Sequence, residues 1–173
     1  ELSHMTKWAN ATFSKMFDQA HGVDLVEGNI NHKKSRLARR NDPGQTSVEE
    51  PSIFHPSEHA GRNLDEAWAV PMGEYFMGNE PDMLLVYASR APVRSLVLSA
   101  ALEHGIKTGG KVEPGSLREN LLKRAEHIDD VVKPLAQAQL VQTIKSGTPE
   151  QKLAALDLLG RFGNASHIDE LRA

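Results

Sequence analysis

The stretch SGTPEQKLAALDLLGRFGNASHIDELRA, residues 146–173, predicts two short helices joined by a tight turn. Thr148, Pro149 and Gln151 form a helix start, because threonine caps a helix, proline suits its first position and glutamine can bond back to the cap. Leucine and alanine fill most of the following positions up to Gly163, where a glycine ends the helix. A segment rich in leucine and alanine is typical of packed helices and predicts an all-α fold.

The helix that starts at Thr148 is apolar on more than one side. Two neighbouring rows of apolar side chains run along it: Leu153, Leu156 and Leu159 in one row, and Ala155, Leu158 and Phe162 in the other. Its polar side chains form one narrow stripe: Glu150, Asp157 and Arg161. A helix with a single polar stripe is expected to be sandwiched between neighbouring helices.

These residues resemble a HEAT-type helical repeat. The resemblance rests on Pro149, on the run LAALDLLGRFG, on the short joint and on the start of a second helix, and it covers residues 146–173 only. Residues 95–106, SLVLSAALEHGI, are similarly rich in leucine and alanine, but their apolar positions do not align with those of residues 153–163. No repeat period is therefore established. The resemblance implies a short α-solenoid-like stack, and an irregular helical bundle is the alternative.

Solenoid units bury their faces against the next unit. The apolar face of the closing helix pair therefore has three expected arrangements. The face is exposed, or the first helix of the chain covers it, or the chain was cut from a longer protein whose next unit covers it. Residues 1–5 resemble a cloning remnant, which fits the last of these.

The remaining chain divides into three parts. Residues 6–22 predict a first helix, capped by Thr6 and ended by Gly22, with an apolar face that includes Phe13 and Phe17. Residues 23–62 predict a long irregular segment, rich in basic and polar side chains. Residues 63–173 predict a helical domain. Its expected helix starts are Asn63, Pro81, Pro92, Ser116 and Pro134. Gly105 is expected to end the helix that starts at Pro92.

Composition excludes several classes of function. The chain has 173 residues, no cysteine and a net charge of −3. The lack of cysteine excludes disulfides and thiolate metal sites. The slightly negative net charge gives the chain as a whole no electrostatic attraction to nucleic acid. Aromatic residues make up only 5%, so leucine, alanine and valine must fill the core. No apolar run is long enough for a membrane span, so a cytoplasmic location is expected, or delivery into a host cytoplasm if the protein is an effector.

Two segments are candidate binding sites. The basic run consists of Lys33, Lys34, Arg36, Arg39 and Arg40. It can contact phosphates, but no aromatic side chains are interleaved for base stacking, and a solvated charge run is the alternative. The second segment, residues 73–83, is expected to be a loop broken by glycine and proline. Its candidate contact residues are Tyr75, Phe76, Met77 and Met83, with the alternative that these side chains fill the core.

Few residues suggest chemistry. His55 and His59 have a spacing that metal sites use, but no third ligand can be assigned, so no metal and no cofactor are expected. Gly115-Ser116-Leu117-Arg118 resembles the GxLR signature of bacterial-toxin GTPase-activating domains, which would make Arg118 an arginine finger. The Gln-Trp-Gly-Thr motif of that family is missing. Ser116 and Glu119 also form a capping box, which explains the motif without catalysis.

We therefore expect a scaffold or adaptor: a helical protein-interaction module whose partner is another protein. It would bind through helix faces and the 73–83 loop. Two alternatives remain open, an effector-type domain that acts through Arg118 and nucleic-acid contact through residues 33–40.

Overall fold

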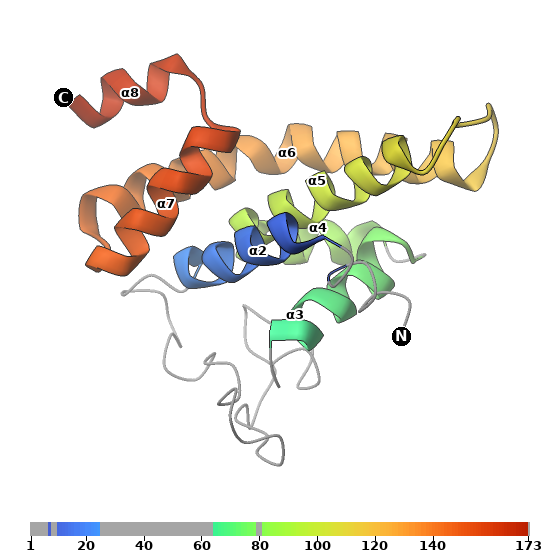
Figure 1. Ribbon diagram of the computed structural model, residues 1–173, viewed down its shortest axis with the longest axis horizontal. Coiled ribbons are helices and arrows are strands. Elements are labelled where there is room, and N and C mark those ends of the chain that lie inside the picture. The colour runs from blue at the N-terminus through green and yellow to red at the C-terminus, as the bar shows by residue number, and fades with distance from the viewer. Residues whose placement is uncertain (1–6, 8–9, 25–63, 79–80, 173) are drawn as a thin grey trace, which may run out of the picture.

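The computed structural model describes Lys7 and residues 10–24, 64–78 and 81–172. These residues form seven α-helices and one π-helical turn, and they contain no strand. In chain order the elements are α2 (Ala11–Asp24), α3 (Leu64–Pro71), η2 (Met72–Phe76), α4 (Pro81–Arg90), α5 (Pro92–Thr108), α6 (Leu117–Ser146), α7 (Pro149–Phe162) and α8 (Ala165–Arg172). The helices pack as a bundle, which confirms the predicted all-α fold (Figure 1).

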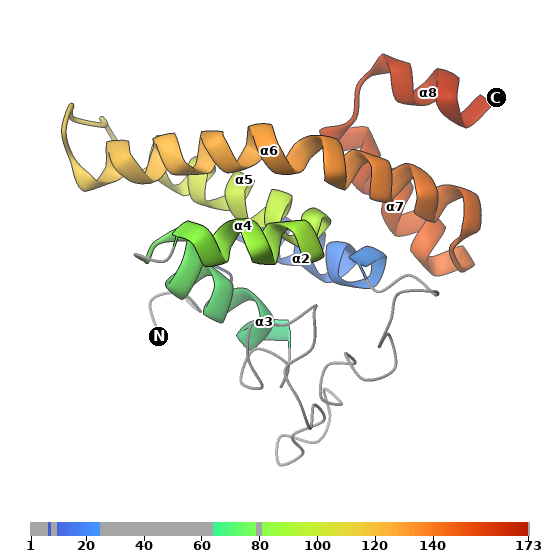
Figure 2. The ribbon, with the colours of Figure 1, turned by 180° about the vertical axis from the view of Figure 1, so that it is seen from behind.

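Helix α5 lies at the centre of the bundle. It packs along the long helix α6 on one side and against α2 and α4 on others. α7 packs on α6 and α2, and α8 extends from the end of α7 (Figures 1 and 2). The α5–α6 connection and the α7–α8 pair therefore lie at opposite ends of the molecule.

The core is built mainly from aliphatic side chains, as the composition predicts. Leu96 and Leu98 from α5, Leu140 from α6 and Leu158 from α7 have no exposed surface. The main aromatic contribution joins α2 to α3. Phe17 and Trp68 are fully buried, and their rings meet edge to face at 5.2 Å. Such a pair adds about 0.5–1.5 kcal/mol beyond the burial of its area.

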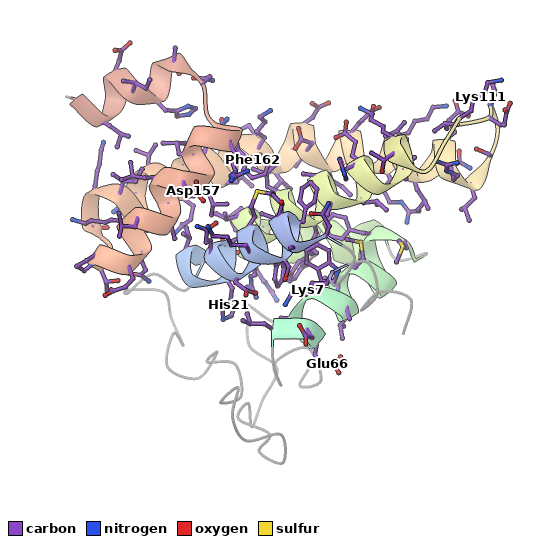
Figure 3. The ribbon with its side chains drawn as sticks, in the orientation of Figure 1. Lys7, His21, Glu66, Lys111, Asp157 and Phe162 are labelled. Carbon is purple, nitrogen blue, oxygen red and sulfur yellow. The ribbon has the colours of Figure 1, made fainter. Side chains whose placement is uncertain are left out.

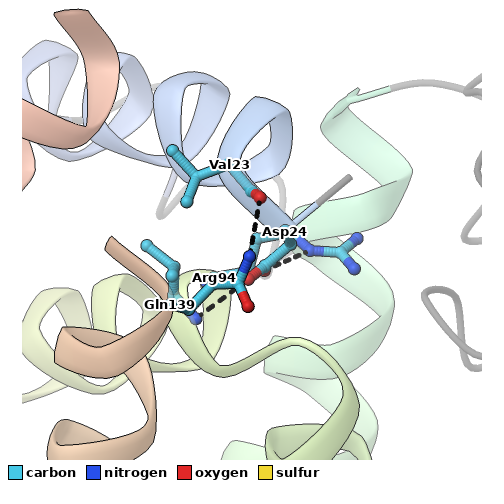
Figure 4. Close-up of polar contacts among 5 residues, drawn as sticks. Val23, Asp24, Arg94 and Gln139 are labelled. Atoms are coloured by element: carbon cyan, nitrogen blue, oxygen red, sulfur yellow. Dashed lines mark hydrogen bonds and ion pairs between the residues drawn. The ribbon is translucent and has the colours of Figure 1, made fainter. Parts of the chain in front are cut away.

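A buried ion pair joins the end of α2 to the start of α5. Asp24 accepts hydrogen bonds from the backbone amides of Val93 (3.1 Å) and Arg94 (3.0 Å), and from Nε of Arg94 (3.0 Å; Figure 4). Asp24 thereby caps α5, since Ala91 at its N-cap offers no side-chain acceptor. Burial raises the pKa of Asp24, and the charge and hydrogen bonds of Arg94 oppose that rise.

Two glutamines complete the junction around the end of α2. The side-chain amide of Gln139, on α6, donates to the carbonyl of Val23 (Figure 4). The side-chain amide of Gln151, on α7, donates to the carbonyl of Gly22. The last carbonyls of a helix have no partner within it, so these bonds satisfy them. The end of α2 is thus fixed by three helices that lie far away in the sequence.

The bounds of α2 differ from those predicted. Thr6, the expected cap, lies outside the described residues. Asn10 caps α2 instead, because its Oδ1 accepts from the amides of Thr12 (3.1 Å) and Phe13 (3.2 Å). The helix also continues past Gly22 to Asp24, since the contacts of Asp24 with α5 keep its last turn helical.

Two further predicted boundaries are wrong. Gly105 does not end α5, which continues to Thr108; two glycines beyond its end, Gly110 (φ 105°) and Gly115 (φ 75°), have positive φ. Pro134 does not start a helix but lies inside α6. A proline inside a helix costs a hydrogen bond. Val132 and Ala136 on either side of it are fully buried, and their packing keeps the helix continuous.

Helix α7 is covered on one side only, so the predicted sandwich is wrong. Ala155 and Leu158 are fully buried against the rest of the bundle. Helix α2, which overlaps the predicted first helix, supplies part of this cover, and its Gln19 donates to Asp157 (3.0 Å). On the opposite side Leu153 is 70% exposed and Leu156 is 47% exposed.

Candidate functional site

The predicted contact segment 73–83 is largely helical, with η2 at its start and α4 at its end. Phe76 is fully buried in the core, and Met77 is half-buried and packs against it. A guanidinium nitrogen of Arg124, on α6, binds the carbonyls of Phe76 (3.2 Å) and Gly78 and so ties the segment to the bundle. Phe76 is therefore a core residue and offers no surface to a partner.

The remaining predicted contact residues lie outside the part of the molecule that the structure describes. This holds for the side chains of Tyr75 and Met83 and for the basic run of residues 33–40, that is Lys33, Lys34, Arg36, Arg39 and Arg40. His55 and His59 fall in the same undescribed region. Within the described residues, no group of three histidine, cysteine or acidic side chains is placed to bind a metal ion.

Arg118, the predicted arginine finger, has a structural role in this arrangement. Its guanidinium binds the carbonyls of Ile106, Gly110 (3.1 Å) and Lys111 (3.3 Å), at and beyond the end of α5. These bonds close the α5–α6 connection, whose tip is marked by Lys111 in Figure 3. To act on a bound nucleotide, Arg118 would have to release all three carbonyls.

A hollow of about 420 Å³ lies between the start of α2 and the second half of α5. It is of the size that small-molecule and side-chain pockets have. Its walls are apolar: Phe13 from α2, Met72 from η2, and Ala101, Leu102 and Ile106 from α5. We call this hollow the α2–α5 groove.

Gly105 is an exposed glycine among the residues that line the groove. A Cβ atom added to this glycine would meet no other atom within 4 Å, although Gly105 lies within α5. Glycine inside a helix costs about 0.5–1 kcal/mol relative to alanine. The glycine therefore leaves the space beside its Cα open, at a cost in helix stability.

The rim of the groove is polar but carries little charge. It consists of Asn10, His104 and Thr108. Asn10 uses its oxygen to cap α2, and its amide nitrogen has no partner among the described residues. The hydroxyl of Thr108 donates to the carbonyl of His104 (2.7 Å), and the imidazole of His104 lies 5.4 Å from the ring of Phe13. Within the described part of the lining, His104 is the single ionisable side chain.

A second apolar surface lies at the far end of the bundle, on α7 and α8. The exposed leucines of α7 continue into a smaller hollow of about 280 Å³ beside α8. Leu156 and Leu159 line it from α7, and Ile168 and Leu171 line it from α8. Ile168 is itself 54% exposed. We call the exposed stripe of Leu153, Leu156 and Gly160 the α7 face.

Comparison with family models, with curated proteins and with solved structures found no match to this chain. The HEAT-type resemblance of residues 146–173, which form α7 and α8, therefore stays a prediction. None of the described helices is both long enough and apolar enough to cross a bilayer.

Neither surface could be found from the sequence as such. The α2–α5 groove joins residues about 90 positions apart, and the one local signal was the glycine of SLVLSAALEHGI. A glycine within a leucine-rich helix indicates either a helix end or a close approach, and the sequence favoured the end. The α7 face was visible as a leucine row, but which of the two rows is buried depends on α2 and α6.

Proposed function

We propose that this protein is a helical protein-interaction module whose α2–α5 groove receives apolar side chains of a protein partner. The observation that carries the proposal is the composition of the groove: five apolar lining residues, a glycine whose added Cβ would meet no atom within 4 Å, and one ionisable side chain among the described residues of the lining. Binding sites for apolar anchors combine such walls with a few polar groups that fix orientation.

The same composition argues against a reaction at this site. General acid–base or nucleophilic catalysis needs at least two groups that act on one another, such as a nucleophile and its base. In the groove, His104 has no carboxylate, hydroxyl nucleophile or second imidazole bonded to its ring within the described residues; the hydroxyl of Thr108 donates instead to a backbone carbonyl. The site is suited to holding a ligand rather than to converting it.

The polar rim favours a peptide-like partner, in which backbone carbonyls lie close to the apolar side chain that enters the groove. The amide nitrogen of Asn10, which has no partner among the described residues, can donate to a carbonyl of that partner, since its oxygen is already used by α2. Methionine adds adaptability to such a surface, because its side chain is flexible and polarizable. Met72 is fully buried at the base of the groove, where it can adjust to different anchors.

The test uses a displayed library of short peptides, selected on the immobilised wild-type chain. We expect the selected peptides to be enriched in leucine, phenylalanine, tryptophan or methionine. The affinity of these peptides is then measured for Gly105→Met, which places a long side chain among the residues that line the groove. We expect a loss of about tenfold or more, the equivalent of about 1.4 kcal/mol.

The matched control is Gly160→Met on α7. Gly160 is likewise a glycine within a helix whose added Cβ would meet no atom within 4 Å, but it lies at the other end of the molecule. This variant should bind the peptides as the wild type does. Equal binding by Gly105→Met and the wild type, or selected peptides without apolar enrichment, would contradict the proposed function.

A further inference from the structure

The α7 face is an exposed apolar stripe on an otherwise well-packed helix. Leu153, Leu156 and Gly160 are spaced by three and four residues, so they lie on one side of α7. The buried side of the same helix, with Ala155 and Leu158, is fully covered. Two leucines with 70% and 47% exposure, three residues apart, make a contiguous apolar surface in contact with water.

Gly160 makes a gap in this stripe. A Cβ atom at Gly160 would meet nothing within 4 Å, and the glycine borders the 280 Å³ hollow between α7 and α8. A small residue on a helix face lets a second helix approach closely, at the shorter end of the usual 8–10 Å between helix axes. The gap is wide enough for a side chain from another molecule, and a leucine fits its apolar lining.

The sequence of α7 is self-complementary about Leu156. Leu153 lies three residues before it and Gly160 four residues after it. On one flank of the stripe, Glu150 lies six residues before Leu156 and Arg161 five residues after it. Two α7 helices that pack antiparallel about a two-fold axis at Leu156 would place each Leu153 within one residue of Gly160, and each Glu150 within one residue of Arg161, along the helix axis, an offset of about 1.5 Å.

We propose that the α7 face is a self-association surface, on which a second copy of this chain packs antiparallel about a two-fold axis at Leu156. Such an interface is isologous, the commonest type among soluble dimers. Leu153 of each copy would fill the gap at Gly160 of the other, and Glu150 of each would pair with Arg161 of the other.

The contacts that Arg161 makes within one copy do not prevent it from pairing with Glu150 of a second copy. The nearest partner of Arg161 is Asp157, at 3.9 Å, a distance at the limit of an ion pair, and both side chains are more than 40% exposed. Asp157 is also held by Gln19 of α2. Arg161 can therefore turn toward a glutamate of the second copy without leaving a buried charge unpaired. Ile168, beside Leu156 on α8, would widen the apolar contact.

The first test uses the absence of cysteine from the chain. In Leu156→Cys the single thiol would lie at the two-fold axis, so that two copies could form a disulfide, which needs Cα atoms about 4.4–6.8 Å apart. We expect rapid formation of a covalent dimer under mild oxidation. Leu117→Cys is the matched control, because Leu117 is 72% exposed at the start of α6, at the opposite end of the bundle. Equal rates of cross-linking for the two variants would overturn the proposal.

The second test measures self-association of the cysteine-free chain by sedimentation equilibrium. A single 14-residue helix gives a small interface, so we expect a dimer with a dissociation constant in the micromolar to submillimolar range. Glu150→Arg and Arg161→Glu should each weaken the dimer about fivefold, since two exposed ion pairs are lost in each case. The double variant Glu150→Arg/Arg161→Glu should restore the wild-type constant.

Two results would overturn the inference. One is a chain that stays monomeric up to submillimolar concentration. The other is a double charge variant that is weaker than either single variant, which would exclude the antiparallel pairing. Circular dichroism checks that each variant is folded, and because all substituted side chains are exposed, no loss of fold is expected. The inference is independent of the groove, and Gly105→Met should leave the dimer unchanged.

Discussion

The carboxylate of Asp24 and the guanidinium of Arg94 form an ion pair of 3.0 Å in which neither side chain has exposed surface. Seventy residues separate the two in sequence. Asp24 ends α2 and Arg94 lies in the first turn of α5, so the pair joins two helices and caps the second one. The guanidinium also lies 5.8 Å from the ring of Tyr87, on α4. The ion pair and the contact with Tyr87 thus connect three helices through one side chain, that of Arg94.

Removing one member of this pair should be strongly destabilising. In Asp24→Ala, Arg94 would keep a buried charge without its counter-ion, and two amides of α5 would lose their acceptor. We expect the free energy of unfolding to fall by about 3–5 kcal/mol, measured by urea unfolding monitored by circular dichroism. The double variant Asp24→Ala/Arg94→Met should lose less than Asp24→Ala alone, because no buried charge remains.

The control for this prediction is an exposed ion pair. Lys111 and Glu113 lie 3.3 Å apart with 82% and 64% exposure, and Glu113→Ala should change stability by less than about 0.5 kcal/mol. A cost for Asp24→Ala as small as that of Glu113→Ala would show that the buried pair does not hold the helices together.

Arg118 should contribute to stability through the end of α5. In Arg118→Ala three carbonyls, those of Ile106, Gly110 and Lys111, lose a charged donor. We expect a loss of about 1–3 kcal/mol and faster hydrogen exchange in the last turn of α5. Arg118→Lys should recover only part of it, since an ammonium cannot reproduce the planar fork of donors. Unchanged exchange in Arg118→Ala would contradict the role, and Lys111→Ala, in the same connection, is the control.

The glycines inside and beyond the helices should respond in opposite directions to alanine. Gly105→Ala should raise the free energy of unfolding by about 0.5–1 kcal/mol, because its Cβ meets no atom and alanine favours the helix. Gly147→Ala should lower it by about 1–3 kcal/mol, because a Cβ there would lie 2.7 Å from the carbonyl oxygen of Thr143. Thermal unfolding of both variants checks the sign, and equal shifts would refute the distinction.

The local signals in the sequence predicted much of this fold. Thr148 and Gln151 form the predicted capping box, with bonds of 3.3 Å and 2.9 Å in the two directions. Ser116 accepts from the amide of Glu119 as predicted (3.2 Å), but the carboxylate of Glu119 accepts from the amide of Gly115 and not from that of Ser116, so only half of this predicted capping box forms. These motifs involve residues three positions apart, so their geometry depends on little beyond the helix they start.

Contacts between distant segments account for what the sequence did not predict. Gly105 and Pro134 are usually signals of helix boundaries, and both lie inside helices because packing against neighbouring elements outweighs local preference. The pairing of Asp24 with Arg94 has no sequence pattern that could indicate it. The exposure of Leu153 likewise follows only from the position of α2 and α6 on the other side of α7.

The start of α6 should respond to acid through Glu119. Its carboxylate accepts from the amide of Gly115 (2.7 Å) and pairs with Lys123 (2.9 Å). The Gly115 hydrogen bond and then Lys123 lower the pKa of Glu119 below its ordinary value of 4.5. The unfolded chain therefore binds the proton first as the pH falls, and the stability that Glu119 contributes is fully present above pH 4.5 and is lost as the pH falls through the pKa of the folded state.

Comparing the wild type with Glu119→Gln isolates this contribution. Glutamine keeps a hydrogen-bond acceptor but has no charge, so its effect on stability does not depend on this titration. We expect the wild type to be the more stable of the two near neutral pH, and the difference to shrink as urea unfolding is repeated at pH values below 4.5. A carbon-detected titration of the Glu119 carboxyl gives the direct check. A midpoint at or above 4.5, or a stability difference that grows in acid, would show that the hydrogen bond to Gly115 does not stabilise the carboxylate in solution.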